Sequence, residues 1–148
     1  MSENEIIKKE NLQITNHDFL IYRDANNDVK ISVLLINNDI WLTQDLIAEL
    51  FGTARSTVTE HINNILKSGE LTEKTSVGIS DISSGGRKPK IYNLDMIIAV
   101  GYRVNSKKAT NFRIWATKIL KEYDKFRIKQ DKLYESDFDK FIKKIEDK

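Results

Sequence analysis

The spacing of apolar positions changes near residue 43 and divides the chain into a strand-rich part and a helix-rich part. Before this point, three short runs are rich in β-branched and aromatic residues: 19–22, 29–36 and 40–42. Asn and Asp fill the intervening turns at 24–28 and 37–39, where they tolerate turn backbone angles. We therefore expect an N-terminal β-hairpin and a following strand, preceded at 1–17 by a polar, flexible arm.

From Thr43 onward the apolar residues recur every three or four positions, which predicts two consecutive helices. Thr43 can cap the first helix and Gly52 can end it, because glycine adopts the left-handed conformation common just past a helix. Thr53 can cap the second helix, which Gly69 closes. The predicted inner faces are Leu46, Ile47, Leu50 and Phe51 on the first helix and Val58, Ile62, Ile65 and Leu66 on the second.

A second strand pair follows the two helices. Apolar residues near period two at 76–82 and 88–92 flank a Ser-Ser-Gly-Gly turn at 83–86. Pro89 cannot donate a backbone hydrogen bond, so we expect its strand at the edge of a sheet. Two strands around a flexible glycine tip are typical of the wing of a winged helix-turn-helix.

The remainder of the chain is predicted to be helical. A short apolar helix covers 94–102, and Asn105 or Ser106 can cap a long helix that reaches roughly Lys129. The apolar stripe of the long helix is Ala109, Phe112, Ala116, Ile119, Tyr123 and Phe126, widened by Trp115 and Leu120. Because Phe112 and Trp115 lie on this regular stripe, we expect them in the core and not in a base-stacking platform.

A last amphipathic segment carries Phe138, Phe141, Ile142 and Ile145. The expected fold is therefore α+β: a winged helix-turn-helix domain at 18–104 with the N-terminal hairpin packed on it, and a C-terminal helical region at 105–148. The apolar faces of the helices at 107–128 and 135–146 exceed the needs of a small domain, so we expect them to join two copies as a homodimer.

Composition excludes several classes of protein. The chain has 148 residues, of which 40% are hydrophobic and 31% charged, as in globular domains. No run approaches the roughly 18 apolar residues of a membrane span, and the polar start lacks the apolar core of a secretory signal. Cysteine is absent, which excludes disulfides and thiolate chemistry and suits a reducing cytoplasm, where we expect the protein.

Charge is distributed unevenly along the chain. The formal net charge is +2, but residues 85–121 carry nine basic residues and one acid, or 9 − 1 = +8, leaving 15 − 21 = −6 for the rest. Solvated helix faces can carry lysines without any partner. A one-sided basic block is also typical of a phosphate-binding face.

The stretch 44–62 has the pattern of a helix-turn-helix. Ala48 is the small residue that lets a second helix cross closely, Gly52 is the turn glycine, and the anchors are Ile47, Phe51, Val58 and Ile62. Thr53, after the glycine, departs mildly from the usual apolar residue. The residues expected to face outward are Arg55, Ser56, Thr57, Thr59, Glu60, His61 and Asn64.

These outward side chains suit base recognition. Arginine can donate two hydrogen bonds to guanine, and serine and threonine can contact bases or phosphates. We expect the second helix to read the major groove of duplex DNA with its first residues nearest the bases. The alternative is a helical hairpin whose outer face is only solvated, and Glu60 argues slightly against nearby phosphate.

The wing supplies positive charge that the two helices lack. Residues 43–67 hold three acids and two bases, whereas Arg87, Lys88 and Lys90 follow the glycine tip. Contacts between such bases and phosphates release counterions and supply most nonspecific affinity. The alternative is an exposed hairpin with solubilising charge.

Several motifs in order resemble the RhuM family of bacterial proteins associated with virulence islands and mobile elements. They are WLTQ at 41–44, AELF at 48–51, YNLDMIIAVGYRVNS at 92–106 and FRIWATKILKEY at 112–123. The arrangement is more distantly similar to Bro-N-type phage antirepressor domains, which share the apolar helix, a serine and a Phe-Arg-x-Trp helix. The resemblance covers roughly 18–125 and implies a DNA-binding regulator, and many family members continue well past this length.

The segment 101–106 allows two interpretations. Gly101 can stop a helix that Asn105 or Ser106 restarts, with Arg103 bonding backbone carbonyls. Alternatively, Arg103, Lys107 and Lys108 form a phosphate or partner site at a helix start.

No catalytic or metal-binding pattern is recognisable. His17 and His61 have no neighbours at metal-ligand spacing, and the acidic turn at 24–28 has Val29 where a calcium loop needs glycine. We therefore expect no enzyme activity, no cofactor and no metal. The predicted function is sequence-specific binding of double-stranded DNA by a transcriptional regulator. The alternative is an antirepressor- or antitoxin-like module that uses its basic block to sequester another regulator protein.

Overall fold

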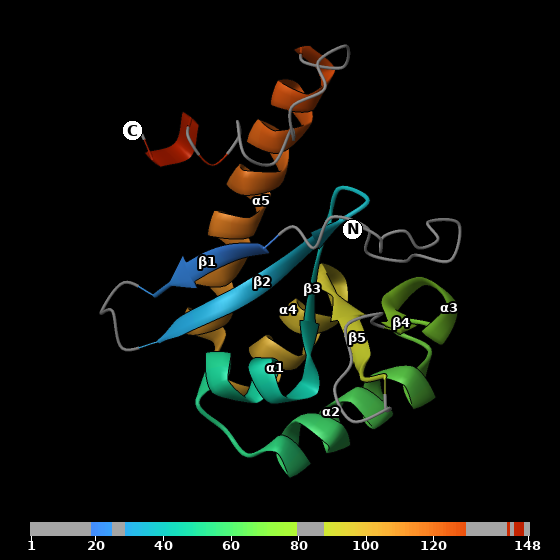
Figure 1. The fold of residues 1–148 in the computed structure, drawn as a ribbon. Coiled ribbons are helices and arrows are strands. Elements are labelled where there is room, and N and C mark those ends of the chain that lie inside the picture. The colour runs from blue at the N-terminus through green and yellow to red at the C-terminus, as the bar shows by residue number, and fades with distance from the viewer. Residues whose placement is uncertain (1–18, 25–28, 80–87, 130–141, 143, 147–148) are drawn as a thin grey trace.

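The structure is a computed structural model that describes residues 19–24, 29–79, 88–129, 142 and 144–146. The strands are β1 (Phe19–Arg23), β2 (Lys30–Ile36), β3 (Asp39–Thr43), β4 (Val77–Ile79) and β5 (Lys90–Asn93). The helices are α1 (Gln44–Phe51), α2 (Arg55–Ser68), α3 (Glu73–Ser76), α4 (Leu94–Val104) and α5 (Ser106–Lys129). Residues 142 and 144–146 are also helical. The expected α+β class is confirmed (Figure 1).

The N-terminal strands form an antiparallel meander, as their composition and the Asn- and Asp-rich turns between them predicted. Between β2 and β3 the chain reverses through Asn37 and Asn38, whose φ angles are 50° and 63°. Positive φ at both central residues matches the right-handed twist of the flanking strands, and asparagine tolerates it better than most side chains. The turn therefore sets the pairing that starts with Ile36 opposite Asp39.

The hairpin and the wing strands belong to one sheet of five strands in the order β1-β2-β3-β5-β4. Trp41, Leu42 and Thr43 of β3 pair antiparallel with Asn93, Tyr92 and Ile91 of β5. The N-terminal strands therefore belong to the same sheet as β4 and β5, whereas the sequence predicted only that the hairpin packs on the domain.

The expectation of an edge strand at 88–92 was wrong. Pro89 lies just before β5, so its missing N–H removes no bond from the ladder, and β5 runs between β3 and β4. β4 pairs with β5 on the other side. The expected wing tip at 83–86, with the adjacent Arg87, lies outside the described residues.

The two helices after β3 begin and end as predicted, with one exception. Thr43 Oγ1 accepts from Leu46 N at 3.2 Å, and Gly52 has φ 68°. Thr53 does not cap the second helix; its N–H donates to the Ala48 carbonyl at 3.0 Å. Because this bond closes the end of α1, the N-cap of α2 falls one residue later, at Ala54, without a side-chain bond.

The segment after α2 differs from the predicted strand. Thr72 caps the four-residue helix α3, so Ser76 is helical and buried, and β4 begins only at Val77. Local capping by a threonine thus competes with the strand pattern.

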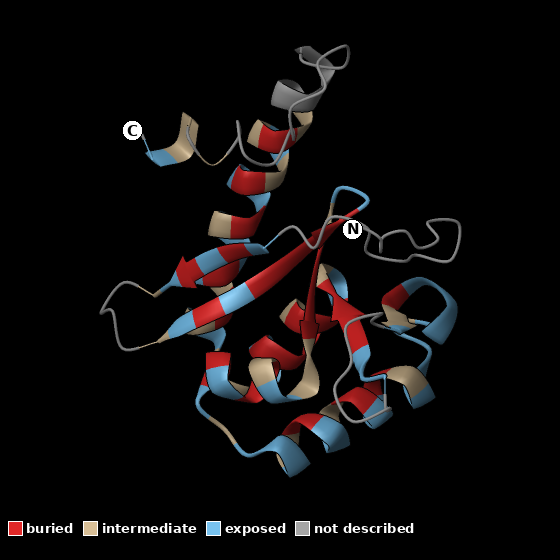
Figure 2. Cartoon of the chain, in the orientation of Figure 1, coloured by how far each residue is buried: buried red, intermediate tan, exposed pale blue. Residues whose placement is uncertain are grey.

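One hydrophobic core joins the inner sheet face to α1, α2, α4 and α5, and Figure 2 shows the buried positions along these elements. The α5 stripe is buried at Ala109, Phe112, Ala116, Ile119 and Tyr123. The Tyr22 ring lies 4.9 Å from Phe112 and 5.0 Å from Trp115 between centroids, so the expected core role of both is confirmed. These five residues therefore pack within their own chain.

Gly101 does not stop a helix, because α4 continues to Val104. A Cβ placed on Gly101 would lie 2.4 Å from Phe51 Cζ, so glycine is required here for close packing. The stop falls at Asn105, whose side chain accepts from Lys108 N at 3.1 Å and restarts the chain as α5.

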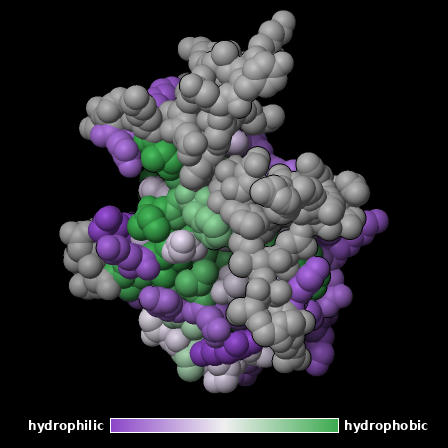
Figure 3. All heavy atoms as spheres, viewed as in Figure 1, coloured by the Kyte–Doolittle hydropathy of each residue, from purple (hydrophilic) through white to green (hydrophobic). Residues whose placement is uncertain are grey.

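The outer sheet face is also apolar. Leu34, Ile36, Trp41 and Ile91 form a small buried cluster there, and Phe19 and Ile21 are exposed. Figure 3 shows hydrophobic residues gathered on the face over β1 and β2, with hydrophilic residues below them. Within the described part of the chain, no helix combines the length and hydropathy needed to cross a membrane.

Candidate nucleic-acid interface

α2 is attached to the core by one side and presents the other to solvent. Val58, Ile62 and Ile65 are buried, as the apolar spacing predicted. Of the predicted outward residues, the exposed ones are Arg55, Ser56, Thr59, Glu60 and Asn64. Thr57 and His61 are half-buried, so they lie at the margin of the solvent face.

A chain of side-chain hydrogen bonds holds the start of α2 against its neighbours. Gln44, the first residue of α1, donates through Nε2 to Thr59 Oγ1. Its Oε1 accepts from the Tyr92 hydroxyl at 3.4 Å, and Thr59 Oγ1 donates to the Arg55 carbonyl at 3.1 Å. Burial raises the pKa of Tyr92, partly offset by the Arg55 charge, so the phenol stays protonated and able to donate. Gln44 therefore links α1, α2 and β5.

Arg55 is partnered by an acid of α1. Its Nη1 lies 3.0 Å from Asp45 Oδ1, and the two side chains are 62% and 69% exposed. An exposed pair of this kind contributes only about 0–1 kcal/mol to stability. The contact orients the guanidinium while leaving it accessible to a ligand.

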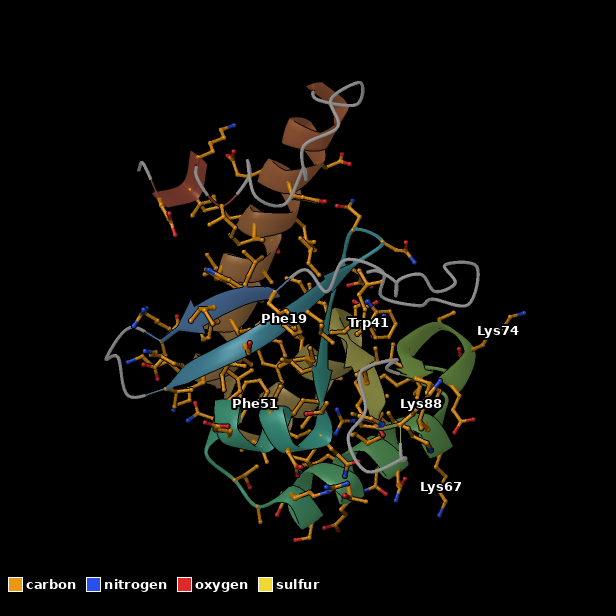
Figure 4. All side chains as sticks on the ribbon, in the orientation of Figure 1. Phe19, Trp41, Phe51, Lys67, Lys74 and Lys88 are labelled. Atoms are coloured by element: carbon orange, nitrogen blue, oxygen red, sulfur yellow. The ribbon has the colours of Figure 1, made fainter. Side chains whose placement is uncertain are left out.

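Lysines extend the polar face of α2 toward the wing strands. Lys88 lies just before β5 and Lys90 is its first residue, and both are exposed. Lys67 on α2 and Lys74 on α3 are exposed as well. In Figure 4, Lys67, Lys74 and Lys88 lie on the same side of the molecule in this view.

Four residues at or near this face were not predicted as candidate site residues: Gln44, Asn63, Lys67 and Lys74. Helical spacing could have found Asn63 and Lys67, because they lie opposite the buried positions of α2. Gln44 and Lys74 carry no local signal, because their role depends on elements distant in sequence.

The other predicted basic residues have different surroundings. Arg103 donates to the Ala99 carbonyl at 3.0 Å and to Glu70 Oε1 at 2.8 Å. Lys108 Nζ lies 3.6 Å from Asp24 Oδ2. Lys107 is exposed in the first turn of α5. Arg103 thus bonds a backbone carbonyl, as the helix-restart interpretation of 101–106 expected. Arg103 and Lys108 also pair with carboxylates of the chain itself.

The described residues bring together no group of three or more His, Asp or Glu side chains that could hold a metal ion. The exposed side chains of α2 offer hydrogen-bond donors and acceptors together with charges of both signs, from Arg55 and Glu60.

Comparison with known proteins identifies the family. A sequence profile of the virulence protein RhuM family matches residues 72–147, which are 147 − 72 + 1 = 76 of the 148 residues and include α4 and α5. Neither a curated protein nor a solved structure matches the chain. Since the profile spans half of the sequence, the chain belongs to the virulence protein RhuM family.

Proposed function

We propose that this chain binds duplex DNA sequence-specifically through α2 and acts as a transcriptional regulator of a mobile element or virulence island. The observation that carries the proposal is the construction of α2. Its inner face is buried on the core, Gln44 donates a hydrogen bond to Thr59 one turn into the helix, and its solvent face carries the donors and acceptors of Arg55, Ser56 and Thr59. A helix so held can enter the major groove as a rigid element.

The connection of the strands supports a winged arrangement. β3 leads directly into α1, and β4 and β5 follow α2, where β5 pairs with both β3 and β4. The wing strands are therefore tied through the sheet to the start of the helix pair. The Gln44–Tyr92 contact joins the same two parts through side chains.

The distribution of charge suggests that the lysines outside α2 have a different role from α2 itself. Residues 43–67 hold two bases and three acids, a net charge of 2 − 3 = −1, so the helix pair alone attracts phosphate poorly. Lys74, Lys88 and Lys90 supply exposed positive charge next to it. In this proposal they contact the DNA backbone, and α2 reads the bases.

We also propose that two copies bind together, because one reading helix covers few base pairs and two-fold pairing doubles the site. Since the α5 stripe is buried within its own chain, the contact between copies uses another surface. The proposed role is binding, without a catalytic step.

Fluorescence anisotropy with labelled duplex DNA, measured across a range of salt concentrations, tests the proposal. The double variant Lys88→Ala/Lys90→Ala should bind more weakly and flatten the salt dependence, because fewer counterions are released. Lys30→Ala, which removes an exposed lysine of β2, is the matched control and should behave like wild type. Absence of binding near 50 mM salt, where nonspecific contacts are strong, would overturn the proposal.

Specificity is tested separately. A selection from random duplexes should yield a preferred site for the wild type, and Arg55→Ala should lose about 1–3 kcal/mol of discrimination at one base pair. Equal loss on all sequences would assign Arg55 to the backbone instead.

A further inference from the structure

The outward side of α5 forms a basic surface that the proposed DNA site does not use. No acidic residue occurs between residues 96 and 121. The exposed positions on this side of α5, with one from the adjoining α4, are Tyr102, Lys107, Arg113, Ile114, Lys118 and Lys121. We call these six residues the α5 outer face.

The middle of this face is apolar and exposed. Ile114 is 56% exposed and Tyr102 is 45% exposed, although both are large hydrophobic residues. The Tyr102 hydroxyl lies 3.4 Å from Thr110 Oγ1, and Ile114 follows Thr110 by four residues, which is one helical turn. Two exposed apolar side chains therefore lie among basic residues: Lys118 is one turn from Ile114, and Arg113 contacts Tyr102.

The polar part of the face is held in place. Arg113 Nε donates to the Tyr102 hydroxyl at 3.3 Å. The hydrogen bonds with Thr110 and Arg113 lower the pKa of Tyr102. These contacts between α4 and α5 reduce the ordering that a partner would have to impose on the tyrosine and the arginine.

This composition fits a protein partner better than DNA. Phosphate binding requires positive charge but gains nothing from an exposed isoleucine, whereas protein interfaces are enriched in tyrosine and arginine around an apolar centre. α5 also extends away from α2 in Figure 1, so DNA lying along α2 would not follow α5.

We propose that the α5 outer face binds an acidic amphipathic helix of a partner protein. Two apolar side chains of that helix, one turn apart, pack on Ile114 and Tyr102, and its carboxylates pair with the lysines of this face and with Arg113. This site is separate from the proposed DNA interface, so either can be present without the other.

Two fluorescein-labelled synthetic peptides test this proposal with the full chain. The first is a helix with two leucines four residues apart flanked by glutamates, and the second has the same composition in an order that separates the leucines onto opposite faces. Anisotropy should show tighter binding of the first peptide, because only its apolar side chains can meet Ile114 and Tyr102 together. Amide shifts in NMR spectra of the labelled chain should concentrate in residues 102–121.

Two exposed substitutions locate the site without threatening the fold. Ile114→Ala and Lys118→Glu should each weaken binding of the first peptide by about tenfold, the loss expected for a central contact or a reversed charge. Lys30→Glu, on β2, should change it little, and DNA binding should be unchanged in Ile114→Ala. Thermal unfolding of each variant verifies that it remains folded.

Three results would overturn the proposal. They are equal affinity for the two peptides, no affinity for either, and peptide-induced shifts outside the α5 outer face. If duplex DNA instead shifts residues 102–121 and Lys118→Glu weakens DNA binding, the face belongs to the DNA interface. Each result is distinguishable from failure of the DNA proposal, which depends on Arg55, Lys88 and Lys90.

Discussion

Gly101 lies within α4 where the Phe51 ring comes closest to its backbone. If the surrounding atoms did not move, a Cβ at this position would lie 2.4 Å from Phe51 Cζ and 2.9 Å from Ala109 Cβ. The usual penalty of glycine inside a helix, about 1 kcal/mol, is therefore offset by the packing of three elements at one point.

We expect Gly101→Ala to lower the free energy of unfolding by about 1–3 kcal/mol, because overpacking forces Phe51 or the α4–α5 contact to move. Urea unfolding followed by circular dichroism measures the change. Adding Phe51→Leu should give a double variant less destabilised than the sum of the single changes. A stabilised Gly101→Ala protein would show that helix propensity outweighs the packing.

Asp39 connects β3 with the start of α4. Its Oδ1 accepts from Ile40 N at 2.7 Å, and its Oδ2 lies 3.5 Å from Asn93 Nδ2. Burial raises the pKa of Asp39 despite these hydrogen bonds. The folded protein therefore holds the proton of Asp39 more tightly than the unfolded chain.

A raised folded pKa means that ionisation of Asp39 costs stability as pH rises above the ordinary carboxyl range of about 4. Asparagine cannot ionise, so we expect Asp39→Asn to gain stability relative to wild type as the pH rises from about 4 to 7. Chemical unfolding at a series of pH values measures this difference. A difference that falls over this range would mean that hydrogen bonding to the carboxylate outweighs burial.

At the scale of the elements, α1 and α2 share a charged contact within the proposed DNA interface. Asp45 lies in the first turn of α1, where the helix dipole stabilises a negative charge. It also pairs with Arg55 of α2. The Asp45 carboxylate orients Arg55, and in the proposed complex it would compete with DNA phosphates for the guanidinium.

We expect Asp45→Asn to increase nonspecific DNA affinity several-fold, because it removes one negative charge and releases Arg55. Glu49→Gln is the matched control, since Glu49 is an exposed acid of α1 for which no contact with Arg55 is seen. It should increase affinity less. Salt-dependent anisotropy with both variants measures the difference, and equal effects would show that only net charge matters.

At the scale of the whole molecule, the boundary predicted between 104 and 105 crosses a shared core. Residues from both sides of it belong to one hydrophobic cluster, among them Leu42 of β3, Val100 of α4 and Phe112 of α5. The Tyr22, Phe112 and Trp115 rings connect the first strand with the long helix. A division into two independent domains therefore stays a prediction that unfolding experiments can test.

We expect the chain to unfold in one cooperative transition. Trp41 lies on β3 and Trp115 on α5. The variant Trp115→Phe therefore keeps only the tryptophan of β3, and Trp41→Phe keeps only that of α5. Within each variant, the remaining tryptophan's fluorescence and circular dichroism should give coincident urea transitions. Separate transitions would support an independent helical region at 105–148.

The candidate site was predictable where exposure follows from helical spacing. Arg55, Ser56, Thr59 and Asn64 are exposed as expected, because a helix fixes which residues oppose a buried stripe. Neighbours from other elements decided the rest: Asp45 pairs with Arg55, and Gln44 connects Thr59 with Tyr92. Arg87 lies outside the described residues, so its role in contacting the DNA backbone stays a prediction.

Local sequence by itself determined most of the strands and helices, with α3 as an exception, together with the glycine turn after α1 and the inward side of α5. These features depend on residues a few positions apart, through backbone preference, capping and periodicity. Only the tertiary structure decided that β3 pairs with β5, that Phe51 needs Gly101, and that Arg103 and Lys108 bind acids of their own chain. The physical reason is that those contacts join residues far apart in sequence, and their geometry exists only after the sheet and helices have packed together.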